Sequence, residues 1–129
     1  MKLAIIGGAG VRVPLLVNGL VQSRLPISDI ALFDVDRDRL DVISGVAARF
    51  AGAARLTAAS TVSEAVEGAD YVFISIRVGG IEGRAQDEAT ALRHGIVGQE
   101  TVGPGGFAMA LRTIPPLVAY AREVIERAP

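Results

Sequence analysis

Short runs of apolar residues alternate along the chain with longer segments in which apolar residues recur every three or four positions. The short runs are typical of strands buried on both faces, and the longer segments are typical of helices with one apolar face. Strands are predicted over residues 3–6, 29–34, 55–59 and 69–76, and helices over 14–21, 40–50, 61–68, 86–92 and 107–128. Because parallel strands need crossover connections, this alternation predicts an α/β fold with a doubly wound parallel sheet and strand order 3-2-1-4.

The last predicted helix has an apolar face and two prolines. Its apolar residues predict one buried face, formed by Leu111, Ile114, Val118, Ala121 and Ile125. Pro115 and Pro116 predict a kink or a restart of the helix. No strand follows before Pro129, whereas a doubly wound sheet places a fifth strand beside the fourth. We therefore expect residues 1–129 to form one domain, truncated before the fifth strand, in a fragment of a longer protein.

The amino-acid composition excludes several classes of function. The 13 Lys and Arg residues nearly balance the 14 Asp and Glu residues, so neither nucleic acid nor an anionic membrane is expected as a partner. The absence of cysteine excludes disulfides and thiolate chemistry, and with His94 as the only histidine no metal site is predicted within the chain. The apolar start ends after residue 6, which is too short for a signal peptide and predicts a cytoplasmic protein.

A glycine-rich turn joins the first predicted strand to the first predicted helix. Glycines in such a turn let the backbone approach a pyrophosphate at the helix N-terminus, as in Rossmann-like domains. The residues predicted to bind a dinucleotide here are Gly7, Gly8, Gly10, Val11 and Arg12, and Val13 stands where G-x-G-x-x-G has its third glycine. A glycine turn that merely joins strand to helix is the alternative.

Asp34 ends the second predicted strand, where a carboxylate can bind the ribose hydroxyls of adenosine. Because its charge would repel a 2′-phosphate, NAD is predicted in preference to NADP. Arg37 and Arg39 weaken this discrimination, since either could pair with a phosphate. Alternatively, Asp34 caps the following helix, although Asp36 is the better cap.

The fourth predicted strand ends at the edge of the sheet where ligands of open α/β folds bind. Arg77 is therefore predicted to bind the cofactor, and Arg84 is predicted to hold an anion. The alternative is that these arginines pair with acids of the following helix, Asp87 or Glu88 in the case of Arg77.

Five glycines between residues 95 and 106 form an unusual loop. Ordering so many glycines is entropically costly and buries little side-chain surface, so the loop predicts a backbone packed closely against a ligand. Glu100 is the only acid of the loop. It could orient or polarise a catalytic group, or it could cap a loop amide.

Several motifs of the second half of the chain are distinctive as a set. They are Ile76-Arg77-Val78-Gly79-Gly80, Gly83-Arg84, Asp87-Glu88, Gly98-Gln99-Glu100-Thr101, Gly103-Pro104-Gly105-Gly106-Phe107 and Ala110-Leu111-Arg112. Together they resemble glycoside hydrolase family 4, and most closely its phospho-β-glucosidase branch. The resemblance extends over essentially the whole chain, although Gly10 stands where many members carry a serine.

The resemblance implies a 6-phospho-β-glucosidase, which hydrolyses phosphorylated glycosides by an exception to the two-carboxylate scheme. In this family NAD⁺ transiently oxidises the C3 hydroxyl of the sugar, which acidifies the C2 proton. A tyrosine removes that proton, the aglycone leaves, water adds, and the hydride returns. A divalent metal, usually manganese, polarises the C3 oxygen.

Residue by residue, the resemblance implies that Arg84 contacts the substrate and that Glu100 raises the basicity of the tyrosine base. NAD would be held by Gly8, Gly10 and Asp34. The tyrosine and the metal ligands would lie beyond Pro129, so residues 1–129 alone are expected to be inactive. The full-length enzyme is expected to be a homo-oligomer.

Two other functions stay open from the sequence. A NAD-dependent 2-hydroxy acid dehydrogenase of the lactate or malate type shares the fold and the cofactor, but the glycine-rich loop argues against it. A non-enzymatic nucleotide-sensing module would be complete as it stands and would show a clear thermal shift with NAD.

Overall fold

Four parallel strands form a sheet in the order β3-β2-β1-β4, which confirms the predicted order. The strands are β1 (Lys2–Ile6), β2 (Asp29–Phe33), β3 (Arg55–Ala58) and β4 (Tyr71–Ile74). In the register of the sheet, Ile5 of β1 lies between Leu32 of β2 and Phe73 of β4. The neighbouring strands β1 and β2 are the most buried, as their dense apolar runs predict. Their carboxyl ends lie at one edge of the sheet.

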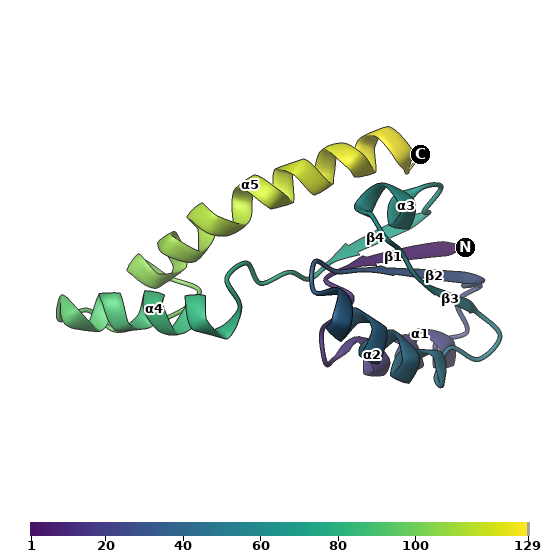
Figure 1. Ribbon diagram of the computed structural model, residues 1–129, viewed down its shortest axis with the longest axis horizontal. Coiled ribbons are helices and arrows are strands. Elements are labelled where there is room, and N and C mark those ends of the chain that lie inside the picture. Colours follow the sequence, from purple (N-terminus) through teal and green to yellow (C-terminus); the bar gives the residue numbers. More distant parts are fainter. Residues whose placement is uncertain (129) are drawn as a thin grey trace. The chain divides into compact units, whose positions relative to one another are not determined.

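Three helices cover this sheet in the computed structural model. Figure 1 shows α1 (Val13–Gln22) and α2 (Arg37–Ala48) on one face and α3 (Val62–Val66) on the other. The main core cluster joins the sheet to α1 and α2, and its larger members are Ile5, Val13, Val17, Ile30, Leu32 and Leu40. The sheet is therefore a rigid support for the loops that leave β1 and β2.

Capping side chains fix the starts of α2 and α3; α2 begins at Arg37, three residues before the predicted start. Asp36 caps α2, because its carboxylate accepts a hydrogen bond from the Arg39 amide at 3.1 Å. Thr61 caps α3 by accepting from the Glu64 amide at 3.1 Å, while the Glu64 carboxylate accepts from the Ser60 amide at 2.6 Å.

The structure describes residues 1–128, and the chain divides into two units. The sheet unit contains residues 1–75 and those from 121 onward, and the helical unit contains residues 76–120. The helical unit holds α4 (Gly80–Arg93) and most of α5 (Gly103–Arg127), which ends in the sheet unit. Within residues 1–128, no helix combines the length and the apolar character that crossing a membrane requires.

The bounds of the last elements differ from the prediction. β4 is shorter than the predicted strand, and α4 begins at Gly80 instead of residue 86. Gly79 makes the early start possible, because its φ of 87° turns the chain into the helix in a conformation that other residues rarely adopt. α5 begins at Gly103 instead of residue 107 and continues through Pro115 and Pro116 as one helix.

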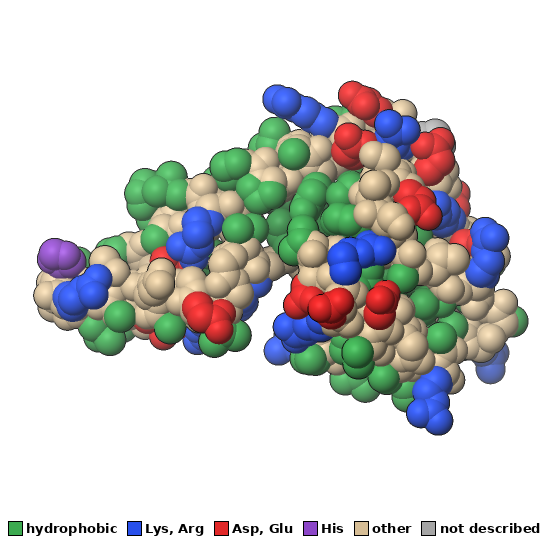
Figure 2. Space-filling view, in the orientation of Figure 1, with side chains coloured by type: hydrophobic (Ala, Val, Ile, Leu, Met, Phe, Trp, Pro, Cys, Tyr) green, Lys and Arg blue, Asp and Glu red, His purple; other side chains and the backbone are tan. Residues whose placement is uncertain are grey.

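The prediction that one face of α5 is buried is wrong. Leu111, Ile114, Val118 and Ile125 expose 61%, 54%, 45% and 81% of their surface, and Ala121 is exposed as well. Figure 2 shows hydrophobic side chains at the surface along α5. Helical spacing predicts an apolar face, but it does not say which segment packs on it.

Candidate functional site

The glycine turn after β1 is held against the end of β2. The amides of Gly7 and Gly8 both donate to the carbonyl oxygen of Phe33, at 2.9 and 2.8 Å. A Cβ atom on Gly8 would lie 2.9 Å from Cβ of Leu32 and 3.1 Å from the Phe33 nitrogen. Gly8, the first glycine of the motif, is therefore required for the turn to pack on β2.

Asp34 fixes the same turn from the other side. Its Oδ2 accepts a hydrogen bond from the Ala9 amide at 3.0 Å, and its Oδ1 accepts from the Asp36 amide at 3.1 Å. Since Asp36 caps α2, Asp34 is not the cap. Each carboxylate oxygen keeps a further lone pair for a ligand hydroxyl. The structure thus brings Asp34 beside the predicted cofactor-binding turn.

Two backbone amides at the start of α1 are free to bind a ligand. Among the described residues, none accepts a hydrogen bond from the N–H of Val11 or of Arg12. Both N–H groups lie at the positive end of the helix dipole, which favours an anion. A Cβ atom on Gly10 would lie 3.4 Å from the Gly7 oxygen, in ordinary contact, so the turn has room there. Donors, carboxylate and space together suit a dinucleotide.

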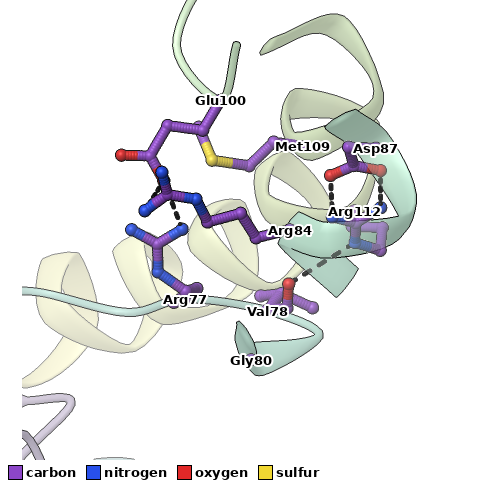
Figure 3. Close-up of a pocket in the computed structure, with 8 residues that line it drawn as sticks. All are labelled: Arg77, Val78, Gly80, Arg84, Asp87, Glu100, Met109 and Arg112. Carbon is purple, nitrogen blue, oxygen red and sulfur yellow. Dashed lines mark hydrogen bonds and ion pairs between the residues drawn. The ribbon is translucent and has the colours of Figure 1, made fainter. Parts of the chain in front are cut away.

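A second cluster of charged side chains lies in the helical unit. Figure 3 shows Arg77 and Arg84 directed at Glu100. The distances to Glu100 Oε2 are 2.7 Å from Nη1 of Arg77 and 3.1 Å from Nη1 of Arg84. Arg84 also donates from Nε to Glu88 at 2.7 Å. The alternative pairing is thus found for Arg84, whereas Arg77 pairs with Glu100 and not with Asp87 or Glu88.

The arginines keep Glu100 ionised. The hydrogen bond from Arg77, together with the charges of Arg77 and Arg84, holds the pKa of the Glu100 carboxyl below its ordinary value despite partial burial. A carboxylate engaged by two guanidinium groups orients both of them. The role of Glu100 toward a tyrosine base stays a prediction.

This lowered pKa predicts how stability depends on pH. A depressed carboxyl pKa stabilises the fold above the unfolded value of about 4.3, and that contribution is lost as the pH falls through the folded pKa. We expect the stability difference between wild type and Glu100→Gln to be constant from about pH 5 to 7 and to shrink below about pH 4. Urea unfolding of both proteins at a series of pH values measures this difference in the free energy of unfolding. A stability difference that stays the same down to about pH 3 would contradict the lowered pKa of Glu100.

The glycines of residues 95–106 allow the chain to pack closely on itself. A Cβ atom on Gly98 would lie 2.8 Å from the Glu88 carbonyl oxygen, and one on Gly106 would lie 2.6 Å from the Thr101 carbonyl carbon. At Gly105 it would overlap the carbonyl oxygen of Gln99. The predicted close approach is therefore present, but the structure shows it against the chain's own backbone.

The structure brings the predicted site residues together in two groups. Gly7, Gly8, Gly10, Val11, Arg12 and Asp34 lie in the sheet unit, and Arg77, Arg84 and Glu100 lie in the helical unit. Within residues 1–128, no group of three or more His, Cys, Asp or Glu side chains could hold a metal ion. The sequence interpretation missed the ion pair of Asp87 and Arg112. The four-residue spacing of Gly83 and Asp87, which places both on one face of α4, was the available signal.

Comparisons with known proteins identify the family to which this chain is similar. The model of the family described as "Family 4 glycosyl hydrolase" matches residues 2–129. The 6-phospho-β-glucosidase of Thermotoga maritima is 34% identical over 96% of this chain and 31% of its own length. The chain spans about a third of the length of the curated relatives it matches.

Solved structures show the same fold within longer chains. The Thermotoga maritima 6-phospho-β-glucosidase with manganese, NAD⁺ and glucose-6-phosphate has a TM-score of 0.95 and 33% identity, covering 99% of this chain and 32% of that chain. A 6-phospho-α-glucosidase from gut microorganisms in complex with NAD and glucose-6-phosphate has a TM-score of 0.91 and 34% identity, covering 100% and 31%.

Proposed function

The chain belongs to family 4 of the glycosyl hydrolases, and we propose that it forms the NAD-binding part of a 6-phospho-β-glucosidase. The observation that carries the proposal is the turn after β1, held on β2 by Gly7 and Gly8 and tied to Asp34 through the Ala9 amide. The similarity to a 6-phospho-β-glucosidase solved with NAD⁺ supports it.

The residues of the turn fit NAD. The free amides of Val11 and Arg12 would bind the pyrophosphate, and Asp34 would accept hydrogen bonds from the adenosine ribose. Gly8 lets the backbone of the turn lie against β2. When bound, NAD supplies a temporary hydride acceptor for C3 of the sugar. The chain's own residues bind and orient it.

Arg84 would contact the phosphorylated sugar, and Glu100 would hold Arg84 in place. Arg77, proposed to bind the cofactor, is oriented by the same carboxylate. A manganese ion, as in the relative, would be bound by residues outside the described part of this chain. Cytoplasmic location, homo-oligomer formation and inactivity of residues 1–129 alone stay predictions from the sequence.

We expect the intact protein to bind NAD at least about tenfold more tightly than NADP, because Asp34 would repel a 2′-phosphate. Arg37 donates to the Ala59 oxygen at 2.5 Å, so one of the two arginines that could offset this repulsion is engaged elsewhere. Asp34→Asn keeps an acceptor for Ala9 but removes the charge, and it is expected to abolish most of the preference. Calorimetric titration with both nucleotides measures it.

Asp36→Asn is the matched control, because asparagine also caps helices well and the same charge is lost two residues away. It should keep the preference for NAD within about twofold. An equal loss in both variants would show that general charge, and not the position of Asp34, selects the nucleotide.

Incubation of the intact protein with NAD, Mn²⁺ and a 6-phospho-β-glucoside tests the proposed function. The expected result is release of glucose 6-phosphate without net NADH, since the hydride returns to the sugar. Accumulation of NADH would identify a dehydrogenase, which the glycosidase relatives do not favour. NAD binding with neither product would identify the nucleotide-sensing module.

A further inference from the structure

Arg112 of α5 runs along the first turns of α4, where two glycines leave space for it. A Cβ atom on Gly79 would lie 3.1 Å from Nε of Arg112, and one on Gly83 would lie 3.3 Å from its Nη2. Gly83 and Asp87 are four residues apart and share one face of α4, and Gly79 precedes the helix as its N-cap residue. Because these two glycines have no side chain, the Arg112 guanidinium can lie against the start of α4 and reach Asp87.

The guanidinium occupies both oxygens of Asp87. Nη1 donates to Oδ1 at 2.8 Å and Nη2 to Oδ2 at 2.5 Å, and the Asp87 side chain is only 7% exposed. Nε also donates to the Val78 carbonyl oxygen at 3.4 Å. Figure 3 marks this contact with a dashed line. Such a bidentate pair has a fixed geometry and neutralises the carboxylate.

Asp87 is also a potential partner for Arg84, because residues three apart on a helix are neighbours. Arg84 instead contacts Glu88 and Glu100. Its link to Glu100, at 3.1 Å, is the longer of the two, and it joins α4 to a distant part of the chain. An unpaired carboxylate at Asp87 would compete with Glu100 for this guanidinium.

We propose that Arg112 is a positioning residue, which keeps Arg84 directed at Glu100 by occupying both carboxylate oxygens of Asp87. Without Arg112, Asp87 draws Arg84 toward itself, and Glu100 keeps only Arg77. The consequence for a phosphorylated sugar rests on the proposed function, in which Arg84 contacts the substrate. The arrangement of the four charged side chains does not depend on it.

The pKa of Glu100 provides a test that needs neither sugar nor cofactor. The charged side chains in contact with Glu100 are Arg77 and Arg84; the hydrogen bond from Arg77 and the charges of both arginines lower the pKa of Glu100. In the intact protein, carbon NMR of the Glu100 carboxyl against pH is expected to show a pKa about half a unit higher in Arg112→Met than in wild type. Arg93→Met, an arginine exchange elsewhere on α4, should leave it unchanged.

A double variant separates positioning from a loss of packing. Arg112→Met with Asp87→Asn removes the competing carboxylate, so the pKa of Glu100 is expected to fall back toward the wild-type value. A packing defect would persist in the double variant. An unchanged pKa in Arg112→Met, or no recovery in the double variant, overturns the proposal. If Arg112→Met does not fold, Arg112→Lys, which keeps one contact to Asp87, should show a smaller rise, and no rise overturns the proposal.

Calorimetric titration with glucose 6-phosphate connects the inference to the proposed function. Affinity is expected to fall about tenfold in Arg84→Met and in Arg112→Met, and to recover in the double variant. If Arg84→Met binds as tightly as wild type, the proposed role of Arg84 fails, while the Glu100 titration still decides the positioning role. If only Arg84→Met loses affinity, the positioning role is overturned.

Discussion

Replacement of Gly105 by alanine is expected to destabilise the helical unit by about 3 kcal/mol or more. The added Cβ atom would overlap the carbonyl oxygen of Gln99, which is backbone and cannot turn away as a side chain would. Relief of the overlap requires residues 98–101 to move, and this displaces Glu100 from its arginines. Urea unfolding of the intact protein measures the loss of stability, and hydrogen exchange of residues 76–120 shows whether the loss lies in the helical unit.

Gly95→Ala is the matched control for this prediction. Gly95 has a φ of 71°, but a Cβ atom there would meet nothing within 4 Å. Its expected cost is the strain of the left-handed conformation alone, about 1 kcal/mol. Equal losses for the two variants would show that the loop is not packed on itself as the structure describes.

Gly8→Ala is expected to weaken NAD binding by about a hundredfold. The new Cβ atom would lie 2.9 Å from Cβ of Leu32 and 3.2 Å from Cδ1 of Leu40, both in the main core cluster. Because the core does not yield, the turn must move off β2, which takes the Ala9 amide away from Asp34. Calorimetric titration of the intact protein with NAD measures the change.

Gly10→Ser controls for the loss of a glycine from the same turn. A Cβ atom at Gly10 is accommodated in ordinary contact, so NAD affinity is expected to stay within about threefold of wild type. A large loss at Gly10 with none at Gly8 would contradict the packing of the turn.

The sequence was a good guide to the sheet unit because the signals there are local. Dense apolar runs predicted the strands, and Asp36 was expected to be the better cap of the following helix, as its hydrogen bond from the Arg39 amide confirms. The bounds of α4 were not predictable in this way. Its first turn contains glycines that oppose a helix, and Arg112, distant in sequence, lies close to Gly83 there.

The part of the candidate site that the sequence predicted also depends on local signals. Asp34 and the glycine turn follow strands whose order the pattern fixes, so their proximity could be predicted. A row of glycines shows only that something approaches the backbone closely. It does not distinguish a ligand from the chain itself, and at Gly98 and Gly105 the partner is the chain. The wrong prediction of a buried face on α5 has the same cause, since the spacing of apolar residues does not identify a packing partner.

Hydrogen–deuterium exchange of the intact protein with and without NAD tests whether the turn after β1 holds the nucleotide. The amides of Val11 and Arg12 have no acceptor among the described residues, and NAD is predicted to slow their exchange markedly, along with that of Ala9. Residues 41–48 of α2 serve as an internal reference and should not change. Protection by NAD that leaves residues 9–12 exchanging at their original rate would contradict the assignment of this turn as the nucleotide site.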